Sequence, residues 1–451
     1  MSVPPDVSDR LLAECLGRPM AYDALRDLCD QIGGRTSGAV SGDRAEDWAA
    51  RHLESSGLER VRYESLEIPV WERGSLLAEV IAPQPRPLNA LAHGFAPDQC
   101  DVTAPIVDVG CGLPEEYDRI GELARDALAL CDETAPPGKR NPHRTERLAW
   151  AVERGAAGLI IAGATAGCLP RTGVCHRNGS PIPSIGLTAE DAGRLRRELE
   201  AGVRPKVRIR MTNTTRTGTA RNVLADIGGA EDRHEIVLAG AHLDSWDVAQ
   251  GATDNGIGCA IVLQAARALM AVGRTPRRSI RFALWAAEET GLRGSRQYVS
   301  AHADELGAIA AVMNFDMTGD PSGYWLPGVS EPPRLFRDLA QQLAPLGMRP
   351  EFTSQAALHS DHQPFMLEGV PIVGLNGPLP ESGGGRYYHS AGDTFEKVSQ
   401  PALCRAAAVA AHTLWAIADA PELPIRRLSR QAVRRMIARA GLTEAVEADT
   451  A

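Results

Sequence analysis

Apolar and polar positions follow two different periods along the chain, and these periods predict where helices and strands lie. In residues 21–32 and 42–56, apolar side chains recur every three or four positions, which is typical of helices with one buried face. Residues 60–70 alternate between apolar and polar side chains, and residues 76–81 form a short, mainly apolar run of strand length. We therefore expect two helices followed by two strands.

The pattern changes after a proline-rich stretch at residues 83–87, which we interpret as a linker. From 88 to 214 the chain is predicted to form short strands with intervening helices. Strands are expected at 105–109, 127–131, 158–161 and 206–211, and helices at 144–154 and 188–201. This part has almost no clustered histidine or carboxylate, so we expect it to be a lid or a wall that bounds a substrate cleft.

From 215 to 422, apolar runs of strand length alternate with segments of helical period. Strands are expected at 235–240, 279–285, 308–315 and 371–375, and helices at 257–272, 292–303, 333–346 and 400–418. This alternation predicts an α/β domain with a mainly parallel sheet that is covered by helices on both faces. Residues 423–451 begin with a run of arginines and are predicted to form a basic helical tail, either solvated or in contact with another subunit.

Composition narrows the class of protein. The chain has 451 residues, with 48 basic and 57 acidic side chains, hence a net charge of −9, which argues against a nucleic-acid partner. No stretch approaches the roughly 18 consecutive apolar residues of a membrane span. The nine cysteines have no regular spacing and no CxxC pair, so we expect reduced thiols. With no signal sequence apparent, the expected location is cytoplasmic.

The candidate chemistry lies where predicted strands of the second half end. These loops carry His242, Asp244 and Asp254, then Glu288 and Glu289, then Asp316, and finally Tyr388 and His389. An aspartate at one strand end is often only a helix cap. Four such ends in one sheet favour a metal site, because the carboxyl edge of an open α/β sheet is where such folds place their sites.

The motifs HLDSWDVAQGATDNG and HSAGDT, with these strand ends, resemble the co-catalytic zinc peptidase family of bacterial leucyl aminopeptidases and glutamate carboxypeptidase. They are most similar to its carboxypeptidase Q branch. The order of a helix, GAAGLIIAG and IPSIGLTAEDAGRL resembles a protease-associated domain. The resemblance implies a three-layer α/β zinc-exopeptidase fold at 1–87 and 215–422, with that domain inserted at 88–214. It also implies a possible homodimer, and secretion, which disagrees with the expected cytoplasmic location.

Carried over by position, the resemblance implies two zinc ions and five ligands. His242 and Asp316 would hold one ion, Glu289 and His389 would hold the other, and Asp254 would bridge the two. Histidine and carboxylate ligands suit zinc, and two ions about 3.5–4 Å apart can share a hydroxide. Cobalt or manganese would also suit these nitrogen and oxygen ligands.

The resemblance also implies three residues that act beside the metals. Glu288 matches the general base, Asp244 matches the carboxylate that orients the first histidine, and Tyr388 matches a group that stabilises the oxyanion. Asn255 departs from many relatives, which have a second aspartate there, and we expect it not to be a ligand. Because side chains alternate along a strand, Glu288 and Glu289 can serve one site only if the chain turns after residue 285.

The structural interpretations of these residues remain open at this stage. Asp254 could be a turn residue, Glu288 and Glu289 a solvated pair, and Tyr388 an aromatic wall. Other polar residues are assigned mainly structural roles. Asp247 and Asp393 are expected to be structural, His359, Asp361 and His362 are either structural or close to the pocket, and His52, His93, His143 and His176 are expected at the surface.

The sequence therefore predicts a dinuclear zinc exopeptidase for short peptides or dipeptides, acting through a hydroxide shared by the metals. Two other classes remain. A single-zinc acyltransferase of the glutaminyl cyclase type has the same fold, and a receptor or scaffold could carry a relict peptidase domain. The complete ligand set argues against both. The side-chain preference and the required peptide terminus do not follow from the sequence.

Overall fold

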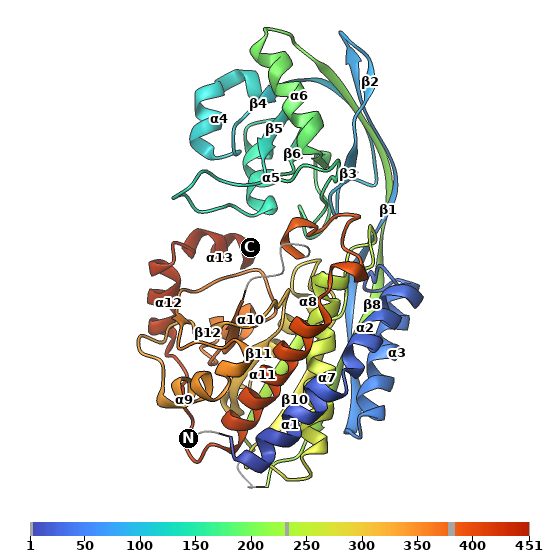
Figure 1. Ribbon diagram of the computed structural model, residues 1–451. Helices are drawn as coiled ribbons and strands as arrows, with labels where there is room; N and C mark the ends of the chain where they lie inside the picture. Colours follow the sequence, from blue (N-terminus) through green and yellow to red (C-terminus); the bar gives the residue numbers. More distant parts are fainter. Residues whose placement is uncertain (1–2, 231–233, 378–383, 451) are drawn as a thin grey trace. The chain divides into compact units, whose positions relative to one another are not determined.

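The computed structural model describes residues 3–230, 234–377 and 384–450 (Figure 1). The chain divides into two compact units. The first comprises Met1–Ile68, Thr219–Arg386 and Asp393–Glu444, and the second comprises Pro69–Gly218, Tyr387–Gly392 and Ala445–Ala451. The second unit thus consists mainly of an insertion in the first, and it also contains a six-residue loop from near the end of the chain.

The first unit is built around a parallel sheet whose central strand is β9 (Ile236–His242). β10 (Ser279–Trp285) pairs with one side of β9 and β11 (Ile309–Asn314) with the other, both in parallel. β8 (Lys206–Ile227) then pairs antiparallel with β10. β9 is buried on both faces, as expected of a central parallel strand between helical layers.

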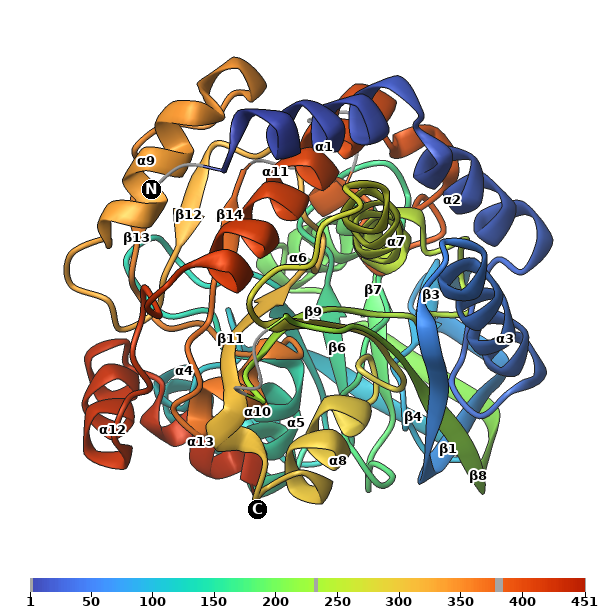
Figure 2. The ribbon, with the colours of Figure 1, turned by 90° about the horizontal axis from the view of Figure 1, so that it is seen from below.

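Helices cover both faces of this sheet. Figure 2 shows one layer on one face and α8 with α10 on the other, in agreement with the packing of α7 and α11 on β9 and of α10 on β11. The first layer consists of α1 (Pro5–Gly17), α2 (Met20–Gln31), α3 (Val40–Ser55), α7 (Ile257–Ala271) and α11 (Gln400–Asp419). The opposite layer includes α8 (Arg293–Ala301) and α10 (His362–Leu367). The α/β class predicted from the sequence is confirmed.

Smaller elements complete this unit. β12 (Gly323–Trp325), β13 (Phe352–Thr353) and β14 (Gly374–Asn376) form a three-stranded sheet, and the remaining helices are α9 (Arg334–Gln342), α12 (Arg430–Arg439) and the start of α13 (Thr443–Thr450). α11 is long and apolar enough to be considered as a membrane span, but 89% of its most apolar 18-residue stretch is buried inside the fold. It therefore serves as a core helix.

The strands of the second unit pair in the order β8-β4-β5-β6-β7-β3, and β8 also belongs to the strands described above, since all of them form one hydrogen-bonded sheet. Its strands are β3 (Ala90–Ala92), β4 (Gln99–Asp108), β5 (Leu128–Asp132), β6 (Gly158–Ala162) and β7 (Ser184–Leu187), and its helices are α4 (Pro114–Ile120), α5 (Arg144–Glu153) and α6 (Ala189–Glu200). β4 to β7 run parallel, and apolar residues of α4, α5, β5 and β6 form a separate core.

Three predictions from the sequence are wrong here. The two strands expected at 60–70 and 76–81 form one strand, β1 (Glu59–Ala82), because Gly74 lets the Thr212 carbonyl approach where a side chain would collide. The expected proline linker contains β2 (Arg86–Pro87), which pairs with β1. His93, expected at the surface, is buried and bonds to Ser184 Oγ at 2.7 Å.

The nine cysteines are all free thiols, as predicted from the sequence. Cys168 is exposed and Cys175 is buried.

Candidate metal centre

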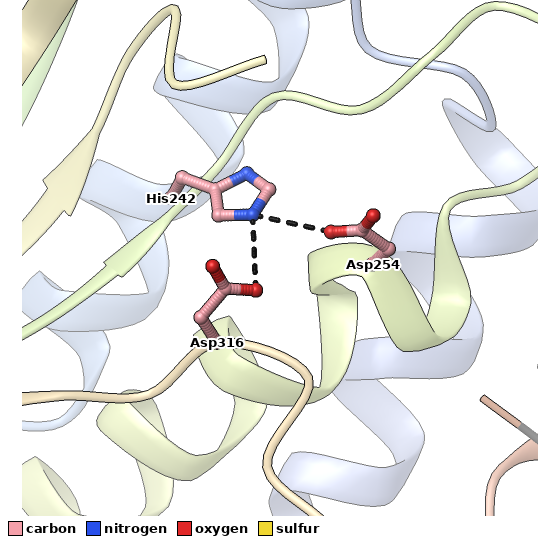
Figure 3. Close-up of side chains that lie close together, drawn as sticks. All are labelled: His242, Asp254 and Asp316. Atoms are coloured by element: carbon pink, nitrogen blue, oxygen red, sulfur yellow. Dashed lines mark ion pairs between the residues drawn. The ribbon is translucent and has the colours of Figure 1, made fainter. Parts of the chain in front are cut away.

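Three predicted ligands of the first unit lie together at the carboxyl edge of its sheet. His242 Nε2 lies 3.2 Å from Asp254 Oδ1 and 3.5 Å from Asp316 Oδ1, and Figure 3 shows the imidazole nitrogen directed at both carboxylates. Each of the three offers one atom within 4.8 Å of the others. A single cation could therefore be held by all three.

Sheet topology explains why these residues meet. His242 is the last residue of β9, and Asp316 follows the end of the neighbouring parallel strand β11. The carboxyl ends of adjacent parallel strands share one edge, so side chains 74 positions apart become neighbours. Asp254 reaches the same edge through the π-helical turn η2 (Ala252–Gly256), which precedes α7.

A hydrogen bond at Nδ1, on the side of the ring away from the cluster, orients the His242 imidazole. Its Nδ1 lies 3.1 Å from the main-chain carbonyl of Asp244. A carbonyl can only accept a hydrogen bond, so Nδ1 carries a proton and Nε2 is the ring nitrogen directed at the cluster. The Asp244 carboxylate, which we expected to orient this ring, lies at 3.6 Å from Nδ1. The acceptor of the Nδ1 hydrogen bond is instead the main-chain carbonyl of the same residue.

The Asp244 carboxylate is instead bonded to the glutamate loop. It accepts the backbone N–H of Glu288 at 3.0 Å and that of Glu289 at 3.2 Å. Ala287 just before them has a φ of +57°, a left-handed turn directly after β10. This turn breaks the alternation of the strand and allows the two adjacent glutamates to serve one site.

Glu289, predicted to be a ligand of a second ion, lies close to Asp254. Its buried carboxylate offers an oxygen within 4.8 Å of one from Asp254. Asp254 therefore belongs to two groups of possible ligands, one with His242 and Asp316 and one with Glu289, and in each group the ligand atoms lie within 4.8 Å of one another. That position suits a bridging ligand.

Asp393, predicted to be structural, and Asn255, predicted not to be a ligand, hold the Asp254 loop. Asp393 accepts the backbone N–H groups of Thr253 at 2.8 Å and of Asp254 at 3.0 Å, as expected of a structural carboxylate. Asn255 donates to the Phe315 carbonyl at 2.8 Å and accepts the N–H of Met317 at 3.2 Å. Its amide therefore ties the Asp254 turn to the loop that carries Asp316.

Sequence reasoning missed two positioning residues. Ser360 donates to Asp316 Oδ2 at 2.6 Å and accepts from Asn314 Nδ2 at 2.7 Å, which leaves Asp316 Oδ1 toward His242. Arg35, in the turn between α2 and α3, donates to the carbonyls of Leu243 and Gly251, both at 2.8 Å. Nothing in the spacing of these residues signals such contacts, although the motif GGRTSG around Arg35 marks a turn.

The electrostatics of the cluster fit a cation. Burial alone would lower the pKa of His242, but the nearby carboxylates of Glu288 and Asp316 outweigh it and raise that pKa well above its usual range. Burial also raises the pKa of Glu288, together with the charges of Asp316 and Asp361, and burial raises the pKa of Asp361 to about 7. This buried excess of negative charge is what bound divalent ions neutralise.

Of the remaining polar residues, Asp361 and His362 are buried, and His362 Nε2 lies 3.0 Å from the Ala357 carbonyl. Asp247 is exposed. His389 and Tyr388 lie in the loop Tyr387–Gly392, which belongs to the second unit. His389 is buried there, and its ring stacks on that of Tyr388 with centroids 3.6 Å apart.

Comparison with known proteins agrees with the fold and the site. Residues 222–414 match the model of peptidase family M28. The chain is 30% identical to carboxypeptidase Q of Rattus norvegicus over 413 residues, covering 89% of this chain and 86% of that protein. It is 33% identical to leupeptin-inactivating enzyme 1 of Streptomyces exfoliatus over 230 residues, covering 47% and 52% of the two chains.

Solved structures show the same architecture. A peptidase M28 precursor from Shewanella amazonensis superposes with a TM-score of 0.82 at 27% identity, covering 94% of this chain and 98% of that one. A zinc aminopeptidase from Bacillus subtilis has the same fold, with a TM-score of 0.67 at 23% identity and coverage of 88% and 93%. The chain is a metallopeptidase and belongs to peptidase family M28.

Proposed function

We propose that this protein is a zinc-dependent exopeptidase that hydrolyses short peptides or dipeptides at a dinuclear centre. The observation that carries the proposal is the position of Asp254, which has His242 and Asp316 on one side and Glu289 within 4.8 Å. The donor set of imidazole and carboxylate suits zinc. The names of a zinc aminopeptidase and of carboxypeptidase Q among the similar proteins support the same assignment.

Each ligand has a proposed place. His242 and Asp316 would hold one ion, Glu289 and His389 would hold the other, and Asp254 would be shared by both. Support for His389 comes from chain connectivity. Asp393 is bonded to the Asp254 backbone, and His389 lies four residues earlier, so its Cα is within about 14 Å of that of Asp393.

Bound zinc supplies Lewis acidity, which lowers the pKa of water and polarises the scissile carbonyl. The chain supplies the proton transfers. Glu288 takes a proton from the attacking water at its carboxylate and passes it to the leaving amine. Asp244 accepts the Glu288 backbone N–H and so restricts the conformations of this residue, which keeps the Glu288 carboxylate close to its working position. Tyr388 donates its hydroxyl hydrogen to the developing oxyanion.

The test compares the parent protein with Glu288→Gln, which keeps size and removes the base. We expect two zinc ions per chain in both proteins, and a fall in the kcat of dipeptide hydrolysis by about 10²- to 10⁴-fold in the variant. Glu331→Gln, at an exposed position, is the matched control and should keep full activity.

The two alternative classes of protein, an acyltransferase and a receptor or scaffold, would differ from the proposed exopeptidase in metal content. One zinc per chain, with cyclisation but no hydrolysis, would identify an acyltransferase of the glutaminyl cyclase type. No metal after zinc is supplied, with retained peptide binding, would identify a receptor or scaffold. Either result would overturn the proposal.

A further inference from the structure

The loop Tyr387–Gly392 is fastened to the second unit through Thr172. The backbone N–H of Thr172 donates to the His389 carbonyl at 2.9 Å, and His389 Nδ1 lies 3.3 Å from the Thr172 carbonyl. Because a carbonyl only accepts, Nδ1 must carry a proton, and Nε2 is the nitrogen suited to bind a metal ion. Thr172 itself is buried, and its hydroxyl donates to the Ala92 carbonyl at 2.9 Å.

Two guanidinium groups of the same unit flank the Tyr388 ring. The Cζ atoms of Arg144 and Arg171 each lie 5.9 Å from the ring centroid. Arg171 is held in place by the Glu133 carboxylate, at 3.0 and 3.1 Å. The Arg144 side chain hydrogen-bonds to that of Tyr388. Arg144 is therefore the cation in contact with the polar end of the tyrosine.

Local structure fixes Arg144 in this position. It is the first residue of α5, and the preceding His143 caps that helix by accepting the N–H of Thr145 at 3.3 Å. Gly173, with a φ of +130°, lies against the Arg144 guanidinium, and any side chain there would collide with it. The space that Arg144 occupies thus depends on Gly173, which directly follows Thr172, the residue bonded to His389.

The geometry points to Arg144 as a positioning residue for the Tyr388 hydroxyl, with the Thr172 carbonyl fixing the His389 ring in the same loop. This inference rests on the proposed function, since it takes Tyr388 as the oxyanion donor and His389 as a ligand. The second unit, expected from the sequence to be a lid or a wall, then contains the two residues that position this loop, Arg144 and Thr172.

The test is a double-mutant cycle with Arg144→Met and Tyr388→Phe, measured by dipeptide hydrolysis. We expect Arg144→Met to lower kcat about 10- to 100-fold with KM nearly unchanged, and Arg144→Lys to recover part of the loss. In the Tyr388→Phe protein, Arg144→Met should have little further effect, because its partner hydroxyl is already gone. Arg154→Met, which removes a guanidinium just after the same helix, is the control and should keep parental activity.

A measurement on the protein without metal or substrate distinguishes a role of Arg144 in positioning the loop Tyr387–Gly392 from a role in stabilising the whole unit. In zinc-free protein, hydrogen exchange of the peptide that contains Tyr387–Gly392 should rise in Arg144→Met, while exchange in α5 and β6 stays at the parental level. If exchange rises throughout the unit, Arg144 has only a structural role and the inference fails.

Two further outcomes are distinguishable. Additive effects in the cycle, or a loss that disappears when the substrate carboxyl terminus is amidated, would make Arg144 a substrate-binding group and overturn the inference. A parent that binds no zinc and hydrolyses no peptide would instead overturn the proposed function.

Discussion

The carboxylate of Asp244 accepts the backbone N–H of Glu288 at 3.0 Å, so the loop after β9 positions the loop after β10. The same carboxylate accepts the N–H of Glu289 at 3.2 Å, while the main-chain carbonyl of Asp244 orients His242. One residue thus holds a predicted ligand on its own strand and both glutamates of the neighbouring strand.

Asp244→Asn tests this relationship. The amide keeps one acceptor oxygen but turns an N–H₂ group toward a backbone N–H, so the glutamate loop loses one of its two anchors. We expect dipeptide hydrolysis to fall about 10- to 100-fold, as for other residues that orient metal ligands. The measurement is kcat and KM at saturating zinc, with zinc content determined in parallel. Asp247→Asn, at an exposed aspartate three residues on, should behave as the parent. Equal activity in Asp244→Asn would contradict the assigned role.

Arg35→Met tests how the His242–Asp254 loop is supported. The buried Arg35 side chain donates to the carbonyls of Leu243, Gln250 and Gly251, at 2.8, 2.6 and 2.8 Å. Each buried acceptor left without a donor costs roughly 1–3 kcal/mol, so the variant should lose at least about 3 kcal/mol of unfolding free energy. Urea denaturation of the zinc-free protein measures this loss.

The exposed Arg26 provides the control for that experiment, because its ion pairs lie at the surface and contribute little. Arg26→Met should shift the unfolding free energy by less than about 1 kcal/mol. A similar small shift for Arg35→Met would mean that the three carbonyls find water as a partner.

Stability should depend on pH through His412, on α11. Burial lowers the pKa of His412, whose Nδ1 lies 2.7 Å from the Ala408 carbonyl and whose Nε2 lies 3.0 Å from Ser8 Oγ. Below about pH 6.5 the unfolded chain binds a proton that the folded chain does not, so this contribution to stability is present at neutral pH. It is lost as the pH falls below that value, by at most about 1.4 kcal/mol per pH unit.

The measurement compares the parent with His412→Gln by urea denaturation at pH 7.5 and pH 5.5. We expect the parent to lose more stability than the variant between the two pH values, whatever the difference between them at pH 7.5. Identical losses would show that His412 protonates in the folded protein as readily as in the unfolded one.

Much of the site is already present in the sequence. His242, Asp316 and Glu289 each lie at the end of an apolar run of strand length or shortly after it, and parallel strands deliver their carboxyl ends to one edge, so local patterns predict that these side chains lie along that edge. The helices around the sheet followed from apolar periodicity in the same way. The long strand β1 did not, because the close approach of Thr212 to Gly74 cannot be seen in either segment alone.

The tertiary structure alone decided which groups hold the ligands. The bonds of Arg35 to Gly251, of Ser360 to Asp316 and of Asp393 to Asp254 join residues separated by 216, 44 and 139 positions. It also assigned the loop Tyr387–Gly392 to the second unit, where Thr172 and Arg144 contact it. Hydrophobic periodicity and chemical type are local properties of a sequence. Hydrogen-bond partners distant along the chain are set by how the elements pack, and so only the folded protein determines them.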